Sequence, residues 1–307
     1  MSTLGEQSLN RKEGPRVSIG VPVFNGKDYL AAALESLLAQ TYADFEIIIS
    51  DNASTDGTSI ICEDFARRDR RVRYYRQIKN VGAARNFNKT FELARGEYFK
   101  WHAHDDECAP TMLERCVARL DNNPEAVLCF TRTQFIDANG QYLSSRDHPL
   151  DLETENRTER FLQFVFPGHI VVEIFGVIRS DVLRKTPLIA SYIGSDLVLL
   201  AEIGLYGPFL VVPEDLFFHR EHPKRSVHAH SDAKARLAWF DTTRSGRFAL
   251  PTWRLIKEHM MSLTRVRLHM AERARIVFGI LRKTNWQRRQ LAEEFMTFFS
   301  SSSGQTR

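Results

Sequence analysis

The sequence predicts an α/β fold, in which a mostly parallel sheet is flanked by helices and followed by a helical C-terminal extension. Short apolar runs alternate with segments of helical periodicity from residue 17 to about residue 123, which is typical of strand-helix-strand units. The isoleucine-rich run 45–50 indicates a strand covered on both faces. From about residue 232 to residue 299 the periodicity is helical.

The first half of the chain contains five predicted strands, at residues 17–23, 45–50, 72–75, 97–103 and 127–135. The helices expected between them place apolar residues three or four positions apart, at residues 29–38, 58–65, 80–95 and 110–120. Pro110 is expected at the first position of its helix and Gly96 just beyond the end of another. Asn139-Gly140 predicts a hairpin turn after the fifth strand.

The second half is less regular. Strands are expected at residues 175–179, 209–212 and 215–220. A short helix is expected to begin at Asp181, and Ser195-Asp196 is expected to cap a helix that runs to about Leu205.

The bulk composition indicates an ordinary globular protein. The chain has 307 residues, 43% hydrophobic and 26% charged, which suits one large α/β domain with an appendage or two modest domains. No apolar run resembles a signal peptide or is long enough to span a bilayer. The four cysteines form no C-x-x-C pair and are expected to be reduced thiols. The sequence therefore predicts a cytoplasmic protein.

The net charge of +4 is unevenly distributed along the chain. Residues 227–307 contain 15 Lys and Arg against 6 Asp and Glu, whereas the rest contains 27 against 32. The basic end would suit contact with an anionic membrane surface, and an ordinary solvated helical face explains it equally well. No nucleic-acid partner is expected.

Carboxylates follow two of the predicted strands. Asp51 comes after the strand 45–50, and Asp105-Asp106 follow the strand 97–103. In a parallel sheet ligands bind beyond the carboxyl ends of the strands, so these acids are expected in one crevice. Carboxylates there could hold Mg²⁺ or Mn²⁺ against the diphosphate of a nucleotide-sugar. The structural alternative is that Asp105 and Asp106 cap the helix near Pro110.

Other nucleotide-binding motifs are absent from the sequence. There is no G-x-x-x-x-G-K-[ST] loop, no G-x-G-x-x-G after the first strand and no G-x-S-x-G elbow. A P-loop triphosphatase, a dinucleotide enzyme of the usual kind and an α/β-hydrolase are therefore disfavoured.

Four segments together resemble family 2 glycosyltransferases of the GT-A fold. They are Val21-Pro22-Val23-Phe24-Asn25-Gly26, the segment from Ser50 to Thr58, the segment from Asn80 to Asn86, and the turn at Asp105-Asp106. They correspond to the family's V-P-x-Y-N, D-[DN]-x-S-T-D-G-T, N-x-G-x-[AS]-x-[AG]-R-N and acidic-turn motifs, in the family's order and spacing. The resemblance covers residues 16–110 and implies a Rossmann-like GT-A domain.

The resemblance implies a donor site for a nucleotide-sugar. Pro22 and Phe24 would flank the nucleobase, Asp51 would bind the base or ribose, and Arg85 would reach the diphosphate as a forked donor. Asn25 and Asn52 belong to the same motifs and are expected at the donor. The alternative for Arg85 is a plain surface residue.

The acidic turn departs from the family pattern. The family often has Asp-x-Asp-Asp here, whereas this chain has Ala103-His104-Asp105-Asp106. Asp105 and Asp106 are the expected metal-binding and donor-binding acids, with His104 as a further candidate ligand. The missing first acid puts metal affinity in doubt rather than donor binding.

The acceptor half is expected to supply the general base. An inverting transfer requires a carboxylate that takes the proton of the acceptor hydroxyl. Asp196, before an apolar helix, matches the family's position for this acid, and it would also suit the first turn of a helix. In the basic loop 219–226, Arg220 is a candidate for the phosphate and His222 for the metal, against the alternative of a solvated loop.

The resulting hypothesis is an inverting glycosyltransferase that moves a sugar from a UDP- or dTDP-linked donor to a hydroxyl of a glycan or lipid-linked acceptor. A nucleotidyltransferase on a related sheet and a catalytically inactive binding protein are the alternatives. The expected organisation is a flexible end at 1–15, a catalytic domain at 16–226 with halves 16–135 and 136–226, helices at 227–299, and a flexible tail at 300–307. The oligomeric state stays open.

Overall fold

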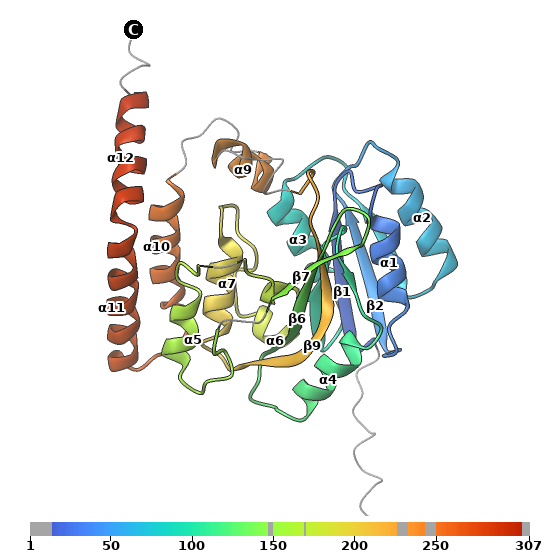
Figure 1. Cartoon of the computed structure of the whole chain (residues 1–307), viewed down its shortest axis with the longest axis horizontal. Coiled ribbons are helices and arrows are strands. Elements are labelled where there is room, and N and C mark those ends of the chain that lie inside the picture. The colour runs from blue at the N-terminus through green and yellow to red at the C-terminus, as the bar shows by residue number, and fades with distance from the viewer. Residues whose placement is uncertain (1–13, 147–149, 169, 226–232, 243–249, 303–307) are drawn as a thin grey trace, which may run out of the picture.

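A single sheet forms the centre of the molecule (Figure 1). The computed structural model describes residues 14–146, 150–168, 170–225, 233–242 and 250–302, and within them nine strands join this sheet. Their order is β3-β2-β1-β4-β8-β6-β9-β5, with β7 paired to β6.

Most strands of the sheet point in one direction. This direction is shared by β1 (Val17–Val23), β2 (Phe45–Asp51), β3 (Val72–Arg76), β4 (Tyr98–Trp101), β6 (Leu128–Ile136) and β9 (Phe209–Arg220). The opposite direction is taken by β5 (Glu107–Cys108), β7 (Tyr142–Arg146) and β8 (Val177–Arg179). The predicted mostly parallel sheet is therefore confirmed.

Two predicted strand boundaries are wrong for local reasons. The segments 209–212 and 215–220 are one strand, because β9 continues past Pro213 through a register shift opposite Thr131 and Arg132. Proline cannot donate to a sheet ladder, so it is accommodated at such an irregularity. Strand β8 begins only at Val177, since Glu173–Phe175 form the 3₁₀ helix η1.

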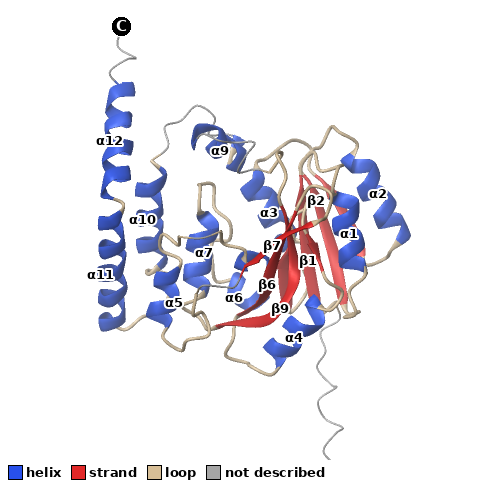
Figure 2. Cartoon of the chain, viewed as in Figure 1, coloured by secondary structure: helices blue, strands red, loops and turns tan. Residues whose placement is uncertain are grey.

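Helices cover both faces of the sheet (Figure 2). One apolar core lies under α1 (Leu30–Leu38), α2 (Thr58–Arg68) and α4 (Met112–Asp121). The second core lies under α3 (Ala83–Glu92), α5 (Arg157–Gln163), α6 (Ser180–Leu183) and α7 (Ser195–Ile203). The remaining helices are α9 (Ala233–Phe240), α10 (Pro251–Ser262), α11 (Met270–Trp286) and α12 (Arg288–Ser302).

The structure changes two expected helix ends. Helix α4 begins at Met112, so Pro110 precedes the helix instead of occupying its first position. Helix α3 ends at Glu92, so Gly96 does not terminate it. Gly96 has a different role: an added Cβ would lie 2.6 Å from the backbone N of Ser18 and the backbone O of Tyr98, so only glycine permits this approach of the chain to β1 and β4.

The C-terminal helices share the second core with the sheet. Leu263, Val266, Ile276 and Ile280 belong to the same buried cluster as Phe209 of β9. Helix α7 is held at both ends, by α10 and by the connection between α10 and α11. Leu255 of α10 packs against Gly194, where an added Cβ would come within 2.9 Å of Leu255 Cδ2, and Arg265 donates to Glu202 at 2.6–3.0 Å. The predicted extension therefore supports the helix that carries Asp196.

The chain ends are only partly described. Residues 1–13 and 303–307 lie outside the described residues, so the flexible ends remain predictions there. Helix α12 continues to Ser302, past the residue where the tail was expected to begin. In the described parts of the chain, no helix is both long enough and apolar enough to cross a membrane.

The ion pair between Arg265 and Glu202 generates a stability prediction. Glu202 is fully buried, and Arg265→Met would leave its carboxylate without its charged partner. We expect the free energy of unfolding in urea to fall by about 2–3 kcal/mol, discounted because Arg265 is partly exposed. The neighbouring Arg267→Met, at an exposed position, is the matched control. Equal losses in the two variants would contradict the bracing role.

Candidate active site

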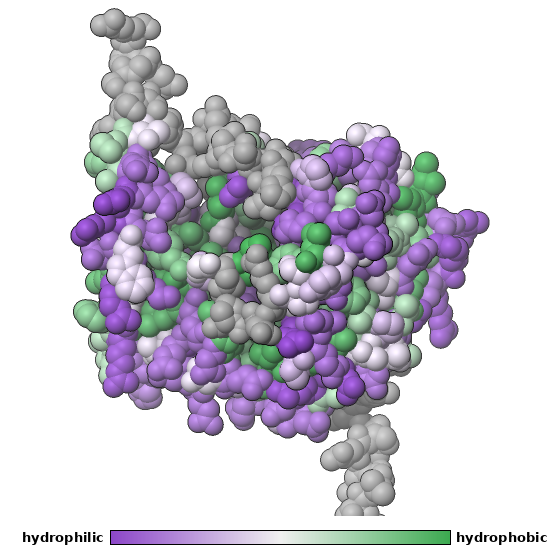
Figure 3. Space-filling view, viewed as in Figure 1, coloured by the Kyte–Doolittle hydropathy of each residue, from purple (hydrophilic) through white to green (hydrophobic). Residues whose placement is uncertain are grey.

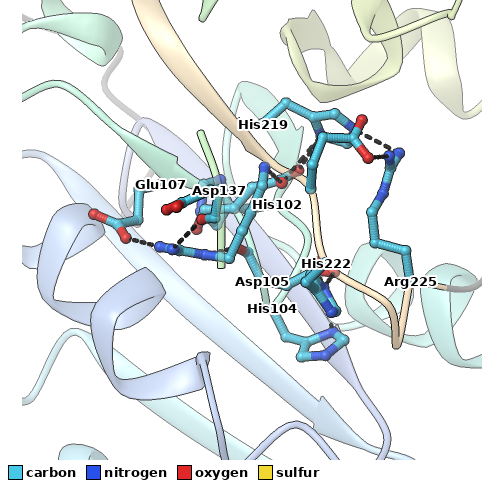
Figure 4. Close-up of polar contacts among 11 residues, drawn as sticks. His102, His104, Asp105, Glu107, Asp137, His219, His222 and Arg225 are labelled. Atoms are coloured by element: carbon cyan, nitrogen blue, oxygen red, sulfur yellow. Dashed lines mark hydrogen bonds and ion pairs between the residues drawn. The ribbon is translucent and has the colours of Figure 1, made fainter. Parts of the chain in front are cut away.

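The acidic turn after β4 meets the end of β9 (Figure 4). Asp105 Oδ2 lies 2.9 Å from His222 Nε2, and Asp105 Oδ1 lies 3.9 Å from His104 Nδ1. Burial alone would raise the pKa of Asp105, but His104 and the hydrogen-bonded His222 hold that pKa well below its usual range. Asp105 is therefore an ionised carboxylate between two imidazoles.

Asp106 faces the other way and binds β9. Arg220 N donates to Asp106 Oδ1 at 2.9 Å, and His219 Nδ1 lies 3.0–3.1 Å from both carboxylate oxygens. Arg225 donates to His219 Nε2 at 2.6 Å, so Nε2 is the acceptor of the ring and Nδ1 carries the proton given to Asp106. Asp106 is only 1% exposed. Its carboxylate joins the turn to β9 and points away from solvent.

The Arg220 guanidinium is occupied by protein partners. Its Nε donates to the Asp105 carbonyl at 2.9 Å, one terminal nitrogen donates to the carbonyls of Asp137 and Ala138, and the other is paired with Glu107. The group also lies 5.1 Å from the centre of the Tyr29 ring. The contact with phosphate predicted for Arg220 would require these bonds to be exchanged.

The loop after β1 lies against the acidic turn. An added Cβ on Gly26 would come within 2.4 Å of His104 Cδ2, so glycine allows the imidazole to pack on the loop. Asn25 has a positive φ of 52°, and its side chain accepts from Thr55 N at 2.9 Å. Phe24 is 41% exposed, whereas Pro22 is buried within β1. Of these residues, Phe24 presents an apolar surface to solvent.

The end of β2 is held by hydrogen bonds. Asp51 is fully buried and accepts from Ser54 N at 2.8 Å and Tyr74 OH at 3.0 Å, with Arg76 Nε 3.5 Å away. Asn52 accepts from Val81 N and donates to Asn80, both at about 3 Å in keeping with ordinary hydrogen bonds. Asn52 therefore ties the β2 end to the loop before α3.

Arg85 stands at the start of α3 with an exposed side chain. It has no hydrogen-bond or ion-pair partner in the part of the chain that the structure describes. One turn further, Asn88 donates to the Ile189 carbonyl at 2.8 Å and accepts from Ile189 N at 3.0 Å. These two bonds bring the loop that leads to Asp196 beside the helix that carries Arg85.

Asp196 occupies the first turn of α7 and is half-buried. Burial raises the pKa of its carboxyl, the backbone N–H groups at the helix start lower it in part, and the Glu173 carboxylate adds to the rise. Glu173 is fully buried in η1, which packs against α7. An aspartate with a raised pKa near an open helix start is chemically suited to accept a proton.

The residues at the turn suit a metal that is shared with a phosphate ligand. Asp105 is ionised, His104 and His222 flank it, and His222 Nδ1 is buried without a hydrogen-bond partner among the described residues. No three His, Cys, Asp or Glu side chains within the described ranges already converge as a ligand set. Mg²⁺ and Mn²⁺ commonly use one or two carboxylates and complete their shell with substrate oxygens, so Asp105 fits this mode.

No site role was predicted from the sequence for several residues that build the site. Asn86 donates to the Ser50 and Val23 carbonyls and accepts from Ser50 Oγ, so it joins the ends of β1 and β2. His219 and Glu107 hold the acidic turn and Arg220 as described above. His219 and Glu107 lie over one hundred residues from their partners Asp106 and Arg220, so no local pattern predicts these two contacts.

The chain belongs to glycosyl transferase family 2. The sequence profile of that family matches residues 18–186, more than half of the 307 residues, which confirms the resemblance found in the motifs. The uncharacterized glycosyltransferase MJ1057 of Methanocaldococcus jannaschii is 28% identical over 180 residues, covering 58% of this chain and 60% of the relative. The matched segments span 60%, 36% and 42% of the first three curated relatives.

Solved structures share the fold. S. aureus TarS 1-349 in complex with UDP-GlcNAc has a TM-score of 0.64 at 15% identity and covers 87% of this chain and 72% of that chain. Mannosyltransferase PcManGT from Pyrobaculum calidifontis, in complex with GDP-Man and Mn²⁺, has a TM-score of 0.54 at 17% identity and covers 94% and 81%. At these identities the likeness shows the fold, and the expected GT-A architecture is confirmed.

The Asp106 contacts generate a second stability prediction. Asp106→Ala would leave Arg220 N and His219 Nδ1 without their acceptor in a buried place. We expect the free energy of unfolding to fall by about 2–3 kcal/mol, as for other buried donors that lose a charged partner. Asp181→Ala, which removes an exposed carboxylate on α6, should change it by less than about 0.5 kcal/mol. An Asp106→Ala variant with an unchanged free energy of unfolding would contradict the assignment.

Proposed function

We propose that this protein transfers a sugar from a nucleotide-diphosphate donor to a hydroxyl of a glycan or lipid-linked acceptor, with inversion at the anomeric carbon. The main support is one juxtaposition. Asp105 follows β4, Arg85 stands at the start of α3, and the two hydrogen bonds between Asn88 and Ile189 hold the segment that leads to α7 and Asp196 beside α3. Ligands of parallel sheets bind beyond the carboxyl ends of the strands, where Asp51 and Asp105 follow β2 and β4. The names of the neighbours support a nucleotide-sugar donor, since TarS binds UDP-GlcNAc and PcManGT binds GDP-Man.

The donor half would hold the nucleotide as follows. Phe24 would lie along the base, Asn25 and the buried Pro22 belong to the same segment, and Asp51 would exchange one of its present donors for a donor of the base or ribose. Arg85 offers its guanidinium to the diphosphate. We assign Asn52, Asp106 and Arg220 to holding the site together, because protein partners already occupy their side chains.

A divalent metal would be held by Asp105, with His222 or His104 beside it. When bound, Mg²⁺ or Mn²⁺ would neutralise charge on the diphosphate as it leaves. PcManGT, in complex with Mn²⁺, supports metal use in this fold. The low pKa of Asp105 keeps its carboxylate charged throughout the neutral range.

Asp196 is the proposed general base. Its carboxylate takes the proton of the acceptor hydroxyl while that oxygen forms a bond to C1 of the sugar. The bond from C1 to the phosphate oxygen breaks on the opposite side, and the nucleoside diphosphate leaves with the electron pair. Helix α7, held at both ends by the C-terminal helices, keeps the carboxylate in position.

The identity of the donor base can be tested directly. We expect UDP or dTDP, with Mn²⁺, to raise the melting temperature more than GDP or CDP does, because binding to the folded state alone stabilises it. The thermal shift should shrink when the metal is chelated. The absence of a shift with all four nucleotides, with and without Mn²⁺, would count against a donor site.

The role of Asp196 generates a kinetic prediction. Asp196→Asn should lower the release of nucleoside diphosphate in the presence of acceptor by at least about 100-fold, the usual contribution of a general base, while calorimetric donor binding stays the same. Wild-type kcat/KM should fall on the acid side with a pKa above the ordinary value for aspartate, since burial and Glu173 raise it. Glu173→Gln should move this limb to lower pH. Full activity of the Asp196→Asn variant would contradict the assignment of Asp196 as the general base.

The role of Asp105 is tested separately. Asp105→Ala should weaken donor binding in the presence of Mn²⁺ by about 10- to 100-fold, and it should remove the difference between titrations with and without metal. His222→Ala should have a smaller effect of the same kind.

Turnover separates an enzyme from a binding protein. A catalytically inactive binding protein would bind sugar nucleotides in these assays but would neither transfer nor hydrolyse them.

A further inference from the structure

The outermost helices carry a stripe of arginine and aromatic side chains. Arg275, Phe278, Arg282, Trp286 and Arg289 are three or four residues apart, so they follow one face of α11 and the start of α12. All five are exposed, with Phe278 at 68% and Trp286 at 74%. We call this set the outer stripe.

A neighbouring face of α11 is fixed to the body of the protein. Ile276 and Ile280 are fully buried in the second core, and Gly279 packs against Leu162, whose Cδ1 would lie 2.5 Å from an added Cβ. Lys283 donates to the carbonyls of Leu162 and Val165. The orientation of α11 is therefore determined by packing, and the outer stripe is presented to solvent as a consequence.

The position of the outer stripe makes it accessible to a flat surface. Helices α11 and α12 follow one another along one edge of the molecule (Figure 1), and hydrophilic and hydrophobic residues alternate along that edge (Figure 3). The three arginines of the stripe have no ion-pair partner in the described parts of the chain. Two carboxylates flank the stripe in sequence: Glu272, three residues before Arg275, is ion-paired with Arg157, and Glu293 is four residues after Arg289.

We propose that the outer stripe docks the protein on an anionic lipid surface. Arginines attract acidic headgroups, while exposed Phe and Trp side chains insert at the level of the headgroups. Contact between two copies through this stripe would place three arginines against three, which repel one another. The stripe thus fits a negatively charged partner better than a second copy. This docking goes beyond the proposed transfer reaction and does not depend on it.

The experiment is co-sedimentation of the full chain with vesicles. Vesicles of phosphatidylcholine mixed with phosphatidylglycerol should carry the protein down, vesicles of phosphatidylcholine alone should not, and binding should weaken with salt. Reversing Arg275, Arg282 and Arg289 to Glu should reduce the partition coefficient by about 100-fold or more. The double variant Phe278→Ser and Trp286→Ser should reduce it as well, without a change of charge.

The matched control replaces Arg67, Arg68 and Arg70 with Glu. This variant has the same change of charge, at exposed positions on and beside α2. It should bind the anionic vesicles far better than the variant of the outer stripe does. Equal losses in the two variants, or no binding of the wild type, would overturn the proposal. A second result would also overturn the proposal: the wild type is a dimer, and altering the stripe dissociates the dimer without changing vesicle binding. UDP-induced thermal shifts in the same samples monitor folding and the donor site independently.

Discussion

The candidate active site depends on one buried carboxylate, Asp106, which joins the turn after β4 to the end of β9. It accepts hydrogen bonds from Arg220 N and His219 Nδ1 and is almost fully excluded from solvent. Because Asp106 is engaged, its neighbour Asp105 faces the other way, toward His104 and His222. Two adjacent acids thereby receive different tasks, one as a structural brace and one as an ionised group available to a ligand.

The sequence predicted the parts of this arrangement that rest on local patterns. Alternating strand and helix periods indicated the parallel sheet, which the structure confirms. The single crevice expected beyond the ends of β2 and β4 stays a prediction. The family resemblance, confirmed by the match over residues 18–186, supplied the motifs from which the donor site is predicted. The bulge at Pro213, the short strand β5 and the late start of α4 escaped prediction, since tertiary pairing decides such boundaries.

Hydrogen bonds between residues distant in the sequence could not be predicted from local sequence patterns. Nothing local distinguishes Asp106 from Asp105, yet contacts with β9, over one hundred residues later, separate their roles. Likewise, Asn52 and Arg220 carry the residue types of ligand contacts but are occupied by protein groups. The support of α7 by Leu255 and Glu202–Arg265 also arises only from packing. Helices that looked like an appendage therefore help to position the proposed base.

The proposed reaction is a displacement at the anomeric carbon by an acceptor oxygen that Asp196 deprotonates. The stereochemistry of the product tests this claim most directly, because a single displacement inverts the anomeric centre. NMR of the product formed from an α-linked donor should show the coupling constant of a β-linked sugar from the first turnover. A product that retains the α configuration would contradict the account.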